Sequence, residues 1–100
     1  MKRMRQKERS ELVRAVEGLH KCRATFLSDE RVTELFEGKT AWDGSVSVFS
    51  IDHPEADTCY AWSSPIEGSK RRKFYAVLKI PPVDSPEAAV RASIVSDYRK

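Results

Sequence analysis

The sequence predicts an α+β domain with two N-terminal helices, a three-stranded antiparallel meander and a C-terminal helix packed on the sheet. Apolar residues recur at helical spacing over residues 10–27. Three runs rich in β-branched and aromatic residues follow between residues 46 and 80. The chain of 100 residues fits one domain of ordinary size. We assign that domain to residues 10–100, preceded by a basic N-terminal arm or helix extension at residues 1–9.

The N-terminal third is predicted to be helical. A long helix is expected over residues 10–27, where the apolar stripe includes Leu12, Val16 and Leu19. A second, short helix is expected over residues 28–37. Ser28 followed by two acidic residues resembles a helix start, and Gly38 can supply a left-handed stop.

The predicted strands cover residues 46–51, 58–63 and 73–80. In the first strand the apolar side shifts from Val46 and Val48 to Phe49 and Ile51. That shift indicates either burial on both faces or a β-bulge. The third strand is the most apolar and should end at Pro81, because proline cannot donate to a strand ladder.

The C-terminal helix has the clearest local signal in the chain. Ser85 can cap it, Pro86 suits the first helical position, and Glu87 follows in the first turn. Val90, Ile94 and Tyr98 are spaced by four residues and should face the sheet.

One sheet face is predicted to remain open, because both long helices are expected on the opposite face. Tyr75 and Val77 would then lie on the open face with Trp62. Exposed apolar patches mark binding surfaces. We therefore expect a homodimer interface or a protein-docking surface that includes Trp62, Tyr75 and Val77.

The charge is segregated along the chain. Residues 1–27 carry eight Lys/Arg against three Asp/Glu, residues 28–67 carry two against nine, and residues 68–100 carry eight against three. Two basic stretches could bind a polyanion such as RNA or DNA. The candidate contacts are Arg3, Arg5 and Lys7 near the N-terminus and Lys70, Arg71, Arg72 and Lys73 between two strands. The alternative is that this loop is a solubility feature and that the neighbouring aromatic residues fill the core.

Metal, cofactor and catalytic sites are not predicted. His20, Cys22, His53 and Cys59 are suitable zinc ligands by type, but their spacing is not that of a zinc finger. On a continuous helix, His20 and Cys22 would point in different directions. We expect Cys59 to be a buried core residue and His53 to cap its turn.

The composition indicates a cytoplasmic protein with no membrane segment. The N-terminus is basic but no apolar stretch follows it, so a signal peptide is not predicted. No apolar run reaches the length of a membrane span. Two cysteines do not form a disulfide framework and suit a reducing compartment.

The order helix, three strands, helix resembles that of the double-stranded RNA-binding domain. That family presents lysines at the start of its last helix, whereas residues 84–88 here include Asp84 and Glu87. The resemblance therefore implies an order of elements rather than RNA binding. Small basic ribonuclease toxins are a second resemblance, without a catalytic set that can be placed on this chain.

The sequence thus favours a small non-enzymatic interaction module that self-associates and docks on protein. A nucleic-acid-binding protein that uses the basic hairpin tip and the N-terminal arm is the first alternative. A small ribonuclease-like enzyme is the second alternative.

Overall fold

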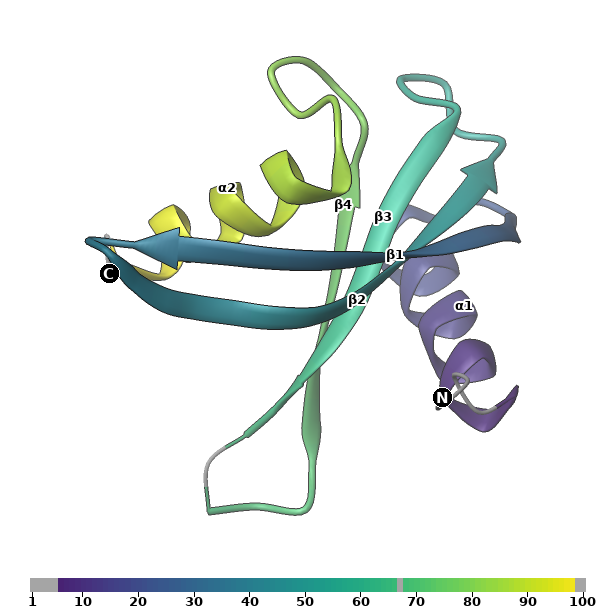
Figure 1. Cartoon of the computed structure of the whole chain (residues 1–100). Coiled ribbons are helices and arrows are strands. Elements are labelled where there is room, and N and C mark those ends of the chain that lie inside the picture. The colour runs from purple at the N-terminus through teal and green to yellow at the C-terminus, as the bar shows by residue number, and fades with distance from the viewer. Residues whose placement is uncertain (1–5, 67, 99–100) are drawn as a thin grey trace.

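The computed structural model describes residues 6–66 and 68–98. Two helices flank one four-stranded antiparallel sheet with the strand order β1-β2-β3-β4 (Figure 1). The elements are α1 (Gln6–His20), β1 (Ala24–Phe36), β2 (Lys39–Ile51), β3 (Thr58–Pro65), β4 (Arg72–Leu78) and α2 (Pro86–Tyr98). The α+β class and the antiparallel sheet are confirmed, but the sheet has four strands where three were predicted.

The predicted short helix over residues 28–37 is wrong, because this segment belongs to strand β1. Glu37 and Gly38 lie between the paired residues Phe36 and Lys39 and connect β1 to β2. Both have positive φ, 52° for Glu37 and 79° for Gly38. Two consecutive residues of positive φ are typical of a tight hairpin turn. Gly38 is therefore left-handed as predicted, but it turns a hairpin instead of ending a helix.

The predicted long helix also ends earlier than expected. Helix α1 stops at His20, and Lys21 follows with a φ of 51°. The backbone N–H of Ala24 donates to Oε2 of Glu17 at 2.9 Å, which ties the start of β1 to the last turns of the helix. Residues 24–27 consequently lie in a strand, where Phe26 packs against the core under α1.

The two helices lie on opposite faces of the sheet. Buried residues of α1 pack with alternate strand residues, including Phe49, Cys59 and Ala61. Buried residues of α2 pack with the strand residues that lie between those in sequence, including Tyr60 and Trp62. Since side chains alternate between faces along a strand, the prediction that both helices cover one face is wrong. The two-sided burial inferred for residues 46–51 is confirmed, with Val46 and Phe49 in different core clusters.

The sheet forks into two hairpins. Strands β2 and β3 pair only from Ser47–Ala61 to Ser50–Thr58. Beyond that point the β1–β2 hairpin continues to Phe36–Lys39, and the β3–β4 hairpin continues to Pro65–Arg72. Figure 1 shows the two hairpins diverging, with the end of the β3–β4 hairpin remote from both helices. This end is the basic segment singled out in the sequence.

Helix α2 agrees closely with its prediction. The backbone N–H of Ala88 donates to Oγ of Ser85 at 3.1 Å, which is the expected N-terminal cap. Strand β4 ends at Leu78, shortly before the predicted stop at Pro81. Within the described residues, neither helix is long and apolar enough to cross a lipid bilayer.

Candidate functional site

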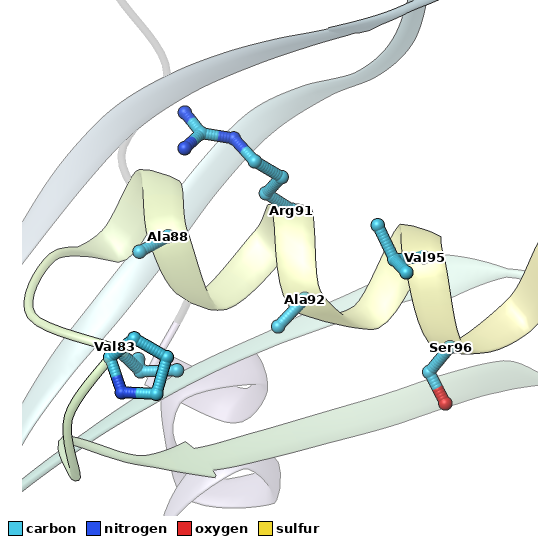
Figure 2. Close-up of a pocket in the computed structure, with 7 residues that line it drawn as sticks. Val83, Ala88, Arg91, Ala92, Val95 and Ser96 are labelled. Atoms are coloured by element: carbon cyan, nitrogen blue, oxygen red, sulfur yellow. The ribbon is translucent and has the colours of Figure 1, made fainter.

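An apolar groove lies along the outer side of helix α2. It has a volume of about 480 Å³, and Figure 2 shows the side chains that surround it. Its lining residues are Pro82, Val83, Ala88, Arg91, Ala92, Val95 and Ser96. The five helical residues of this set recur at intervals of three and four, which places them on one face of the helix.

The inner face of the same helix carries a different set of side chains. Ala89 and Val90 are fully buried against the sheet, and Ile94 packs against the same cluster. Apolar residues therefore occupy both sides of α2. A helix on a protein surface normally shows polar and charged residues on its outer side. The outer side of α2 departs from this rule at Ala88, Ala92 and Val95.

Arg91 is the charged residue at the rim of the groove, and it is held by a carboxylate of β1. Its Nε donates to Oε1 of Glu34 at 2.9 Å, and its Nη2 lies 3.5 Å from Oε2. Glu34 is 7% exposed. The hydrogen bond and the negative charge of Glu34 raise the pKa of Arg91. The pair anchors α2 over β1 and neutralises the charge at the groove rim.

The predicted interface residues Trp62, Tyr75 and Val77 lie on the sheet face that α2 covers. Trp62 is 1% exposed, and its ring stacks on that of Tyr75 with centroids 5.1 Å apart. Tyr75 and Val77 are half-buried in the same cluster. The open apolar face expected from the sequence is thus occupied by α2, and Trp62 is a core residue of the monomer.

The turn between β3 and β4 and the first two residues of β4 form a hairpin tip, defined here as Ile66 and residues 68–73. Lys70 and Arg71 are exposed. Arg72 turns back onto β3, where its Nε donates to Oγ of Ser63 at 2.8 Å and its Nη2 to the Ser63 carbonyl at 3.2 Å. Nζ of Lys73 lies 5.0 Å from the centroid of the Tyr75 ring.

The N-terminal cations are only partly placed. Lys7 falls in the first turn of α1, whereas Arg3 and Arg5 lie outside the described residues. Arg9, from the same basic stretch, places its guanidinium 3.8 Å from the centroid of the Phe26 ring. A cation over an aromatic face is attracted by the negative charge density of the ring. Arg9 thus helps to hold α1 on β1.

The two histidines and two cysteines gather on the α1 side of the molecule. The rings of His20 and His53 meet edge to face at 6.2 Å, and Cys22 packs against the cluster that contains Cys59. Cys22 lies beyond the end of α1, so the helical geometry assumed for His20 and Cys22 is wrong. The described residues nevertheless contain no group of three or more side chains that could hold a metal.

Cys59, His53 and His20 each have a structural place in the fold. Cys59 is fully buried, and desolvation raises the pKa of its thiol to about 12, which is opposite to the activation that a nucleophile needs. Nδ1 of His53 accepts the backbone N–H of Glu55 at 3.0 Å, which confirms its predicted place in the turn. An imidazole nitrogen of His20 lies 2.7 Å from the Ala76 carbonyl and joins α1 to β4.

Sequence reasoning singled out the hairpin tip but missed the groove on α2. Ala88, Ala92 and Ser96 are spaced by four residues, as are Val90 and Ile94 on the inner side of the helix. Two such series on one helix are the signal that could have identified an apolar outer face. No family model matches the sequence, and neither a curated protein nor a solved structure matches the chain.

Proposed function

We propose that this protein is a non-enzymatic interaction module that forms a homodimer through the outer groove of α2. The observation that carries the proposal is the apolar lining of that groove on a helix whose other side already fills the core. Both faces of the central sheet are used by the two helices, so dimerisation through an open sheet face is replaced by dimerisation through α2.

Self-complementarity favours a second copy of this chain as the occupant. The groove is hollow where Ala88 lies beside Pro82 and Val83, and it carries Val95 at the other end of the same helical face. In an antiparallel pair of α2 helices, a two-fold axis midway between Ala88 and Val95 places each Val95 over the hollow of its partner. An isologous interface requires this reciprocal arrangement.

The helix dipole favours the same antiparallel arrangement. A helix carries partial positive charge at its N-terminus and partial negative charge at its C-terminus, so antiparallel helix dipoles attract one another.

The length of α2 indicates how tightly the two copies should associate. The helix has 13 residues, so it is about 20 Å long. Contact through one such helix on each side falls at the small end of specific protein interfaces. We therefore expect a concentration-dependent dimer, with little dependence on salt because most of the contact is apolar.

Light scattering over a concentration series tests the proposal. The wild type should approach dimer mass at about 100 μM and monomer mass on dilution. Ala92→Glu should remain a monomer at the same concentration, because it places a bulky charged side chain where the two helices approach most closely. Ser10→Glu adds the same charge at an exposed position of α1 and should dimerise normally. A wild type that stays monomeric at about 100 μM would overturn the proposal.

A further inference from the structure

We propose that the hairpin tip binds the phosphate backbone of duplex nucleic acid, with Lys70 and Arg71 as the contacting residues. The tip projects from the sheet because β3 leaves β2 after the Ser47–Ala61 pair, while β3 and β4 remain paired to Pro65–Arg72 (Figure 1). A projecting two-stranded ribbon is one of the two elements that the major groove of DNA admits.

Hydrogen bonds fix the tip backbone on both sides of Lys70, so the backbone that carries the exposed cations is ordered before binding. The backbone N–H of Ile66 donates to the Arg71 carbonyl at 3.1 Å, and the N–H of Ser69 donates to the Ile66 carbonyl at 3.1 Å. The N–H of Arg71 donates to Oγ of Ser69 at 3.0 Å. Gly68 adopts the positive φ of 77° that this turn requires. An ordered loop loses less conformational entropy when it binds.

The four cations have different roles. Arg72 is fixed to Ser63 and Lys73 lies over the Tyr75 ring, so these two shape the ribbon. Lys70 and Arg71 are exposed, and among the described residues neither forms an ion pair. Their charges are therefore available to an external anion.

The positive field at the tip is far from the acidic loops. Asp57 precedes β3 and Asp84 follows β4, so both lie at the end of this hairpin opposite to the tip. A strand of eight residues spans about 26 Å. Screening at physiological salt acts over about 8 Å, so those carboxylates do not cancel the field at the tip. Between Asp57 and Asp84 the sequence has five cations and one acid, Glu67.

Fluorescence anisotropy with a mixed-sequence DNA duplex tests this assignment. Lys70→Ala/Arg71→Ala should lower the affinity roughly tenfold or more at about 100 mM salt and reduce the salt slope by about one to two. Arg14→Ala/Lys79→Ala removes the same charge from exposed positions away from the tip and should bind nearly as the wild type does. Equal weakening by the two double variants would overturn the tip as the site.

DNA binding by the dimerisation variant and binding of poly-glutamate by the wild type are two further measurements. Retention of DNA binding by the Ala92→Glu variant is expected, because the tip does not depend on the α2 dimer. Poly-glutamate should bind more weakly than DNA, because it lacks the geometry of a duplex. Wild-type protein that does not bind DNA at about 50–100 mM salt, or that binds poly-glutamate as tightly, would overturn the proposal. The second outcome would favour an acidic protein surface as the partner.

Discussion

The indole Nε1–H of Trp42 donates a hydrogen bond to Oγ of Ser64 at 3.1 Å across the fork of the sheet. Trp42 belongs to β2 and Ser64 to β3, but these strands no longer pair at that level. The Trp42 ring also meets that of Trp62 edge to face, with centroids 6.1 Å apart. Where the backbone hydrogen bonds between β2 and β3 end, these side-chain contacts hold the two strands together, and they fix the angle between the two hairpins.

Gly44 should be required for this arrangement. A Cβ at Gly44 would lie 2.9 Å from Cη2 of Trp42, so Gly44→Ala must displace the ring. We expect a loss of about 1–2 kcal/mol of unfolding free energy by denaturant melts. In a Trp42→Leu background the same change should become neutral or slightly stabilising, because glycine is unfavourable within a strand. An equal loss in both backgrounds would contradict the role given to the ring.

Arg91 should stabilise the domain by neutralising the buried carboxylate of Glu34. Arg91→Ala leaves that carboxylate without its partner, so the melting temperature should fall. Adding Glu34→Gln to Arg91→Ala should recover part of the loss, because a neutral amide is easier to bury. If the double variant is less stable than Arg91→Ala alone, the proposed coupling is wrong.

Asp43 should contribute to the acid sensitivity of the fold. Hydrogen bonds from Thr33 and Arg31 lower the pKa of Asp43. Because the folded-state pKa lies below the unfolded value of about 3.9, this stability is present above pH 3.9 and is lost as the pH falls through the folded-state pKa. Thermal melts at a series of acidic pH values should show a smaller pH dependence for Asp43→Asn than for the wild type. Identical pH profiles of melting temperature for Asp43→Asn and the wild type would show that Asp43 does not contribute to the acid sensitivity.

The cap and the inner face of α2 should differ in their contributions. Ser85→Ala should cost about 1 kcal/mol through loss of the bond to the Ala88 N–H, whereas Ser85→Gly should cost only a few tenths. Ile94→Ala should cost about 2 kcal/mol or more, because Ile94 packs against the core on that side. Denaturant melts compare the three variants, and a milder effect of Ile94→Ala than of Ser85→Ala would contradict the assigned inner face.

Local signals predicted helix α2 correctly and misassigned strand β1. The residues Ser85, Pro86 and Glu87 act within one turn, so their meaning does not depend on distant partners. Ser28 and Asp29 resemble a similar start, but Asp29 instead accepts the hydroxyl of Ser47 at 2.7 Å from the neighbouring strand. Such pairing joins residues that are distant in the sequence, so the local pattern around Ser28 does not predict it.

The sequence predicted the hairpin tip as a candidate binding surface but did not predict the groove on α2. The tip could be predicted because Lys70 and Arg71 stand in a run of four cations, and a charged run between strands projects into solvent. The groove was missed, because small residues such as Ala92 suit contact with the sheet as well as an outer hollow. The side of α2 that faces the sheet was predicted correctly at Val90 and Ile94.

Cross-linking at the centre of α2 tests the homodimer most directly. The proposed two-fold axis passes between Arg91 and Ala92, so Ala92→Cys in a Cys22→Ser background should form a disulfide-linked dimer under mild oxidation. Ser10→Cys in the same background should remain monomeric, because that position of α1 is exposed and lies outside the interface. Formation of the covalent dimer by Ala92→Cys alone is the predicted result. Failure to cross-link at about 100 μM, or equal cross-linking at both positions, would contradict the antiparallel α2 dimer.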